Sequence, residues 1–246
     1  MELIKIAKKY FDAQKGEKKI QSVDFIADTE GNTYLNDIEK YPHLFVLACI
    51  MDQQVKAEKA WEIPIKIAKC INSYEFVDFA KLTLEDCKVI FSKNKLHRFN
   101  DRQAKYFYEA IQKIKNEYQS YAANIWKDNP KSATLVLRFI EFEGVGIKIA
   151  TMAANILVRQ FKIKVEDKYS IDISPDVHIR KIFYRMGLIN NRKNTEEIIY
   201  KARELNPDFP GIIDLATWKV GREYCFEKNP NCLECPIRQD CKKKIG

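Results

Sequence analysis

The stretch FIEFEGVGIKIATMAANIL, residues 139–157, places two apolar segments on either side of Gly144-Val145-Gly146. The second segment is rich in small residues and is long enough for several helical turns. Two glycines separated by one residue allow a tight reversal between antiparallel helices, because glycine accepts a positive φ without steric cost. The stretch therefore predicts two helices joined by a tight turn.

This turn would leave backbone N–H groups free at the start of the second helix, where the helix dipole also favours an anion. The arrangement is typical of the helix-hairpin-helix motif, which holds the DNA backbone without reading bases. An ordinary turn between packed helices is the alternative interpretation. Lys148 follows in the first turn of the second helix. Taken alone, it would be a solvated surface lysine.

A second informative stretch is CFEKNPNCLECPIRQDC, residues 225–241. Its spacing is Cys225-x6-Cys232-x2-Cys235-x5-Cys241, whereas zinc sites usually show two close Cys pairs. One loop around a cube-shaped cluster explains the unequal gaps better, so we predict a 4Fe–4S cluster on these four thiolates. Zinc is the alternative. The remaining cysteines, which we predict to be small core residues, are Cys49, Cys70 and Cys87.

The composition is that of a folded protein with 46% hydrophobic residues in 246. No apolar run spans a bilayer and the lysine-rich start lacks a signal-peptide core, so we expect a soluble intracellular protein without a membrane partner. A net charge of +8 suggests a polyanion such as nucleic acid, although a solvated lysine-rich surface is the alternative.

The hydrophobic period is helical nearly throughout, which predicts an all-α protein. Residues 20–35 differ, since they alternate loosely around Glu30-Gly31-Asn32 and predict a small N-terminal hairpin. Thr83 and Asp86 predict a capping box. Residues 161–175 fit no element. Helices are predicted over 2–14, 42–54, 56–71, 74–80, 84–93, 101–125, 130–141, 147–160, 175–187, 195–204 and 208–222.

The glycine turn with Lys148, the later Asp176-Val177-His178 and the cysteine loop occur in an order that resembles the endonuclease III family. These are helix-hairpin-helix base-excision DNA glycosylases and AP lyases with a C-terminal 4Fe–4S loop. The resemblance covers most of residues 40–246 and implies a six-helix barrel domain over 37–158. It implies a second domain with the iron–sulfur cluster, built from 1–36 and 159–246.

The resemblance also implies roles for individual residues. Lys148 would attack the sugar C1′ of a flipped, damaged base, an oxidised pyrimidine above all, and β-elimination would then nick the strand. Asp176 would stabilise positive charge on the sugar and assist proton transfer. As an alternative, an aspartate at this position is commonly only a helix N-cap.

DNA contacts follow from the same resemblance. Gly144, Val145 and Gly146 would hold the backbone, and Gln54, or Gln53 beside it, would lie near the flipped base. The residue that fills the vacated gap would come from the loop LHRFNDRQ, with His97, Arg98 and Phe99 as candidates. The implied partner is double-stranded DNA with a damaged or mismatched base, bound by a monomer in the cytoplasm of a prokaryote, at the nucleoid.

Several positions depart from the family pattern. Glu143 and Ile147 replace a usual proline and a usual basic residue, and the segments 18–36 and 161–175 look inserted. These departures bear on the substrate more than on the fold. Two other functions therefore stay open. One is a monofunctional mismatch glycosylase for thymine, uracil or adenine, and the other is a non-catalytic iron–sulfur DNA-binding protein.

Overall fold

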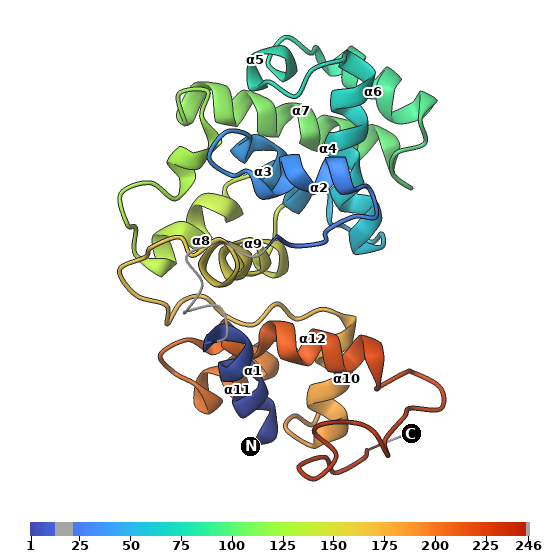
Figure 1. Ribbon diagram of the computed structural model, residues 1–246, viewed down its shortest axis with the longest axis vertical. Coiled ribbons are helices and arrows are strands. Elements are labelled where there is room, and N and C mark those ends of the chain that lie inside the picture. Colours follow the sequence, from blue (N-terminus) through green and yellow to red (C-terminus); the bar gives the residue numbers. More distant parts are fainter. Residues whose placement is uncertain (13–21, 245–246) are drawn as a thin grey trace. The chain divides into compact units, whose positions relative to one another are not determined.

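The computed structural model describes residues 1–12 and 22–244, which form helices and loops and contain no strand (Figure 1). The all-α prediction is confirmed for this part of the chain. By its contacts the chain divides into unit 1, from residues 1–20, 131–136 and 154–246, and unit 2, from residues 21–130 and 137–153. The domain boundaries inferred from the sequence stay a prediction.

Unit 2 is organised around α3 (Pro42–Met51), all ten residues of which are buried. Its sequence PHLFVLACIM is apolar on every side, as expected of a helix surrounded by others. The helices α2, α4 and α7 and the 3-10 helix η1 all pack against it. Its one polar side chain, His43, contacts the carbonyl of Tyr74 at 3.1 Å, and burial lowers the pKa of His43 to about 4.

Unit 2 also contains the C-terminal part of α8 (Ser132–Ile140) and the N-terminal part of α9 (Ile147–Arg159), together with its other elements. They are α2 (Thr29–Asn36), α4 (Ala57–Ile71), α5 (Phe76–Phe79), α6 (Leu84–Lys93), α7 (Asn100–Glu117) and η1 (Ala122–Ile125).

In unit 1, α12 (Asp214–Glu223) packs against α10 (Val177–Met186) and α1 (Glu2–Asp12). The remaining helices are α11 (Thr195–Leu205) and the 3-10 helix η2 (Pro210–Ile213). Gly221 of α12 faces α10, where an added Cβ would stand 2.7 Å from the Cβ of His178. Glycine therefore permits the close approach of these two helices.

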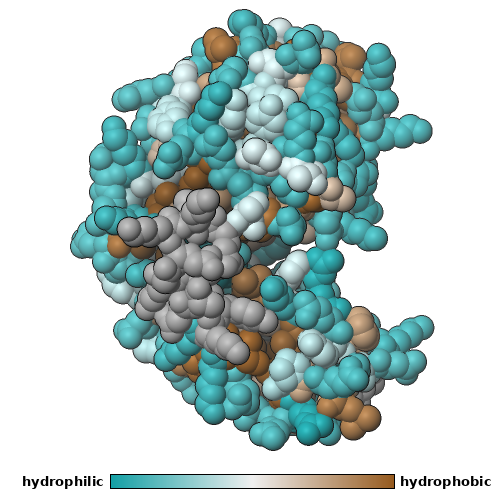
Figure 2. All heavy atoms as spheres, viewed as in Figure 1, coloured by the Kyte–Doolittle hydropathy of each residue, from teal (hydrophilic) through white to brown (hydrophobic). Residues whose placement is uncertain are grey.

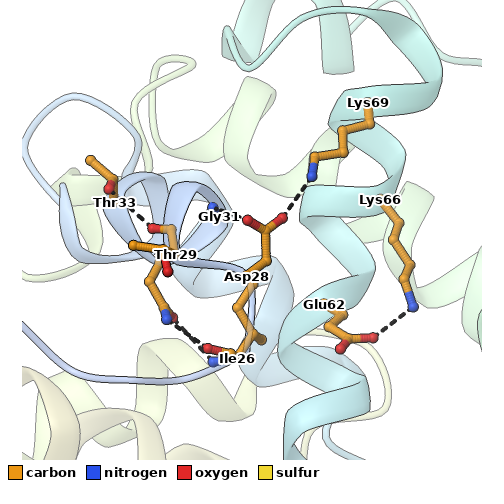
Figure 3. Close-up of polar contacts among 9 residues, drawn as sticks. Ile26, Asp28, Thr29, Gly31, Thr33, Glu62, Lys66 and Lys69 are labelled. Atoms are coloured by element: carbon orange, nitrogen blue, oxygen red, sulfur yellow. Dashed lines mark hydrogen bonds and ion pairs between the residues drawn. The ribbon is translucent and has the colours of Figure 1, made fainter.

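The N-terminal hairpin prediction is wrong, because the described part of residues 20–35 contains α2 and no strand. Asp28 caps α2 by accepting from the Gly31 N–H, and it also pairs with Lys69 of α4 at 2.6 Å (Figure 3). Phe25 stacks on Trp61 of α4 with ring centroids 4.1 Å apart. The loose alternation thus reflects an extended segment and a short capped helix, both lying on α4.

The single helix predicted over 101–125 is also wrong at its end. α7 stops at Glu117, and Gln119 and Ser120 adopt positive φ before η1 begins. Both α7 and η1 are apolar on one side, so the hydrophobic period alone did not indicate where the helix ends. The other predicted helices in the described residues are present with shifted ends, and 208–222 divides into η2 and α12. Residues 13 and 14 of the first predicted helix and residues 18–21 of the apparent insertion lie outside the described residues.

Two smaller predictions have clear outcomes. The capping box is confirmed, since Thr83 and Asp86 exchange side-chain to backbone hydrogen bonds at the start of α6. Cys49 and Cys87 are buried as predicted, but Cys70 is exposed. No helix in the described part of the chain could cross a bilayer. The face drawn in Figure 2 is mostly hydrophilic, consistent with burial of the apolar side chains.

Asn32 offers a test of the α2 segment. Its buried Oδ1 accepts from the N–H groups of Phe25 and Ile26, and its Nδ2 donates to the carbonyl of Ile26. We expect Asn32→Ala to lower the free energy of unfolding by about 2–3 kcal/mol in urea titrations, because buried backbone groups lose their partners. Thr33→Ala, at an exposed site of the same helix, should change it by less than about 0.5 kcal/mol. Equal effects would contradict this role for Asn32.

Candidate active site and cysteine pocket

The hairpin predicted from Gly144-Val145-Gly146 is present between α8 and α9. Gly144 has φ +80°, and an added Cβ there would stand 2.4 Å from the Tyr106 ring. The N–H of Val145 donates to Phe142, while Gly146 is exposed with nothing within 4 Å of an added Cβ. Only Gly144 is thus required by the turn itself. The first N–H groups of α9 have no partner within their own helix, as at any helix start.

Lys148 lies in the first turn of α9, and its Nζ is 2.6 Å from Oδ2 of Asp52. Asp52 follows α3 directly, and its side chain is 9% exposed against 35% for Lys148. A nearly buried carboxylate requires a cationic or hydrogen-bonding partner, which Lys148 supplies. Burial and the charge of Asp52 raise the pKa of the Cys49 thiol, whereas Lys148 acts to lower it. Cys49 therefore remains a neutral thiol beside the pair.

The loop after α3 holds Gln53 firmly and exposes Gln54. The Gln53 side chain donates to Ile50, and its carbonyl lies 3.0 Å from Nε2 of His97. Gln54 is exposed with φ +55°. The structure thus joins the two loops from which we predicted DNA contacts, through Gln53 and His97, each of which was one of the predicted alternatives.

His97 is nearly buried and acts as the link. Its Nδ1 accepts from the Phe99 N–H at 3.1 Å, so Nε2 carries the hydrogen that it donates to Gln53. Burial lowers the pKa of His97, and the charges of Lys59, Arg102 and Arg98 act in the same direction. The imidazole is therefore neutral near pH 7, and His97 is positioned to support the loop.

The exposed side of this loop is cationic and aromatic. The guanidinium carbons of Arg98 and Arg102 lie 4.8 Å and 4.5 Å from the centroid of the Phe99 ring. Guanidinium groups bind phosphates and stack on rings, and aromatic rings stack on unpaired bases. The sequence analysis named Arg98 and Phe99 and missed Arg102, which lies one helical turn further along.

Asp176 lies in unit 1 at the start of α10. Its Oδ1 accepts from the Ile179 N–H at 2.8 Å, so the N-cap interpretation is confirmed as one of its roles. A second acid lies near it, because the charge of Asp176 acts on buried Asp214. Burial raises the pKa of Asp214 to about 6, against the effects of Arg159 and the Ser174 N–H. Lys148 and Asp176 belong to different units.

The segment 161–175 before Asp176 has no helix but is held at several points. The side chain of Asp172 pairs with Arg203 of α11 through two contacts of 2.8 Å, and the Asp172 carbonyl accepts from Asn155. The Ser174 N–H donates to Asp214 at 2.7 Å. These contacts fix the backbone that leads into the N-terminus of α10.

The four clustered cysteines line one pocket, with Ile182, Met186 and Ile237 among its walls. Burial raises the pKa values of Cys235 and Cys241, and each is affected by the charges of neighbouring cysteines. No three metal-ligating side chains in the described residues are placed as ligands of one ion. The thiols therefore surround a space and do not converge on a point.

Two basic side chains of α10 interact with this region, and one of them, Arg185, lines the pocket. Arg185 donates to the Sγ of Cys225 at 3.2 Å and to the carbonyls of Phe226 and Glu227. Lys181 donates to Gly221, and burial lowers its pKa against the effect of Cys225. Donors aimed at sulfur stabilise a thiolate. The sequence analysis missed both residues, although their spacing of four places them on one face of a helix.

Asp52 and Asp214 were also missed. Asp52 directly precedes Gln53 and Gln54, and an acid at the end of a wholly apolar segment was the available signal. Asp214 has no comparable signal, because only the packing of α12 brings it near Asp176.

Comparison with solved structures identifies the fold. A trapped endonuclease III–DNA covalent intermediate, an estranged-adenine complex, has a TM-score of 0.60 at 14% identity, over 87% of this chain and 92% of that chain. A non-covalent endonuclease III–DNA complex gives 0.61 at 14%, over 87% and 91%. A thermostable thymine-DNA glycosylase gives 0.63 at 13%, over 98% and 96%.

The chain therefore has the helix-hairpin-helix DNA glycosylase fold, and this prediction is confirmed. No model of a protein family and no curated protein sequence matches the chain. At such identities the likeness establishes the fold, and function has to be argued from the residues of the site.

The two hairpin glycines provide a matched test of the turn. We expect Gly144→Ala to lower the free energy of unfolding by more than about 1 kcal/mol, because alanine is strained at this φ and its Cβ would meet Tyr106. Gly146→Ala should cost less than about 1 kcal/mol, because its added methyl group meets open space. Chemical denaturation of both variants measures the difference. Similar losses would show that the turn does not depend on Gly144.

Proposed function

We propose that this protein is a DNA N-glycosylase that removes a damaged base from duplex DNA and also acts as an AP lyase. The observation that carries the proposal is the placement of Lys148 in the first turn of the helix that follows a Gly-Val-Gly hairpin. The solved endonuclease III structures with the same fold include a trapped covalent complex with DNA. A helix-start lysine that can form such a bond is what this chemistry requires.

The hairpin supplies the grip on DNA. The exposed Gly144 and Gly146 let a phosphate approach the first N–H groups of α9, and the space beside Gly146 is open. Gln54, Arg98 and Phe99 act on the base stack. The Phe99 ring and the guanidinium groups that lie over it replace the stacking that a flipped base gives up. Glu143 is exposed next to the turn and weakens phosphate binding there.

The chemical step uses an amine and an acid. The Lys148 amine attacks C1′ of the flipped nucleotide, and the base leaves with the electrons of the glycosidic bond. Asp176 stabilises the positive charge that develops on the sugar. The C1′–O4′ bond of the sugar then breaks, O4′ takes its electron pair and a proton, and an imine forms between Lys148 and C1′. The imine acidifies the C2′ hydrogen, and loss of this proton with the 3′ phosphate by β-elimination nicks the strand. An oxidised pyrimidine is the proposed substrate.

The cysteine pocket fits a 4Fe–4S cluster held by Cys225, Cys232, Cys235 and Cys241. Four thiols around a space suit a cluster better than they suit one zinc ion, whose ligands stand about 2.3 Å from the metal. Arg185 and the Lys243 N–H provide donors to sulfur that offset thiolate charge. Such a cluster would fold the C-terminal loop and present Lys228, Arg238 and Lys242 to phosphates.

A monofunctional glycosylase is the second candidate. The ion pair with Asp52 gives Lys148 a structural role that requires no chemistry, and the thymine-DNA glycosylase structure covers 98% of this chain. In either case we propose that a monomer acts on double-stranded DNA in the cytoplasm of a prokaryote, at the nucleoid.

Borohydride trapping tests the bifunctional mechanism. With duplex DNA containing one thymine glycol, we expect a covalent adduct for the natural protein and for Lys113→Ala, whose lysine is in an ion pair elsewhere in unit 2. Lys148→Ala should form none, because the attacking amine is gone. An adduct that forms on an abasic site but not on thymine glycol would support Lys148 as the nucleophile and exclude thymine glycol as the substrate. Base release without any adduct would select the monofunctional enzyme, and DNA binding without base release on any lesion would select the non-catalytic protein.

Metal analysis tests the cluster. We expect about four iron and four acid-labile sulfide per chain, with loss of iron in Cys232→Ser because one ligand is removed. Cys70→Ser should retain the iron, since Cys70 is exposed on α4, outside the pocket. A result of one zinc per chain and no sulfide would contradict the cluster and indicate a zinc site.

A further inference from the structure

The Asp52–Lys148 pair joins a nearly buried carboxylate to a partly exposed amine. The Asp52 carboxylate is 9% exposed and lies 2.6 Å from the Lys148 amine, which is 35% exposed. At this distance, within unit 2, a proton can pass from nitrogen to oxygen without movement of either backbone. The solvent-exposed portion of Lys148 leaves room for a reacting atom.

The carboxylate is held in place more firmly than the amine. Asp52 caps α3, where its N–H donates to the Cys49 carbonyl at 3.1 Å. The next residue, Gln53, is fixed by Ile50 and His97. Lys148, by contrast, reaches Asp52 with a flexible side chain and is able to swing away after losing its charge. A fixed acceptor beside a mobile donor suits a proton transfer that precedes attack.

We propose that Asp52 is the group that accepts a proton from Lys148 before the lysine attacks the sugar, an inference that rests on the proposed function. The N–H bond of the ammonium breaks, and the proton moves to Oδ2 of Asp52. The freed lone pair of Nζ forms a bond to C1′ while the C1′–N bond breaks and its electron pair leaves with the base. At an abasic site the same lone pair attacks the aldehyde carbon, and water leaves as the imine forms.

The other titratable groups around the pair do not take this role. The Cys49 thiol of α3 is fully buried, and its raised pKa keeps it neutral and protonated. His97 has both ring nitrogens engaged, one with Gln53 and one with the Phe99 N–H. Asp176 belongs to unit 1, where it caps α10, and the proposed function assigns it to the charge on the sugar. Asp52 acts through Lys148, and Asp176 acts on the substrate.

The test is the pH dependence of imine formation in Asp52→Asn, measured as single-turnover borohydride trapping on an abasic site between pH 6 and 9. Asparagine keeps the shape and accepts a hydrogen bond, but it cannot take the proton. We expect trapping about 100-fold slower at pH 7, with a deficit that shrinks as pH rises, because solvent then deprotonates the lysine. Asp52→Glu should recover part of the rate, because it restores a carboxylate.

Each other outcome overturns the inference. A deficit that is the same at every pH would mean that Asp52 only positions Lys148, and faster trapping would mean that it restrains the lysine. Equal rates would mean that it has no role. If Asp52→Asn does not fold, the pH profile of Asp52→Glu decides alone. The proposal predicts that this variant has the pH dependence of the natural protein, and a loss of rate that is the same at every pH would contradict it. If the natural protein forms no trapped adduct at all, the proposed function is rejected. This outcome distinguishes failure of the proposed function from failure of the inference about Asp52.

Discussion

The complete burial of α3 is the constraint on which unit 2 depends. A helix that is apolar on every side must be surrounded, so α2, α4, α7 and η1 take their places around it. The polar groups that follow it in the chain emerge at one end of a packed core. Asp52 is the first of these, and its nearly buried charge is balanced by Lys148 at the start of α9. The same packing that stabilises the unit therefore positions the proposed nucleophile.

In unit 1, α10 links several of the residues that the proposals use. Asp176 caps the beginning of this helix, and Arg185 near its end donates to Cys225 of the cysteine loop. One helix thus connects the proposed catalytic aspartate with the proposed cluster ligands, and Gly221 lets α12 pack closely against it. A change in the loop would reach Asp176 through this helix. This connection would give the proposed cluster a structural role.

Three acidic groups, Asp52 of unit 2 and Asp176 and Asp214 of unit 1, differ in environment. Asp214 is buried, and its pKa is raised to about 6 by burial and by the nearby charge of Asp176. Asp52 is nearly buried but has a lysine in contact, and Asp176 is held by a backbone N–H. Carboxyl groups in unlike surroundings can hold protons at different stages of one reaction.

The sequence by itself determined the features that depend on local chemistry. Helical periodicity gave the all-α class, Gly144 gave the turn that requires a positive φ, and the cysteine spacing gave the loop that forms one pocket. Only the tertiary structure decided which residues meet across the chain, as Asp52 meets Lys148 and His97 meets Gln53. It also decided that residues 29–36 form α2, because that short helix depends on Asp28, Asn32 and the surface of α4. Contacts between residues distant in sequence leave no period or spacing, so they follow from packing alone.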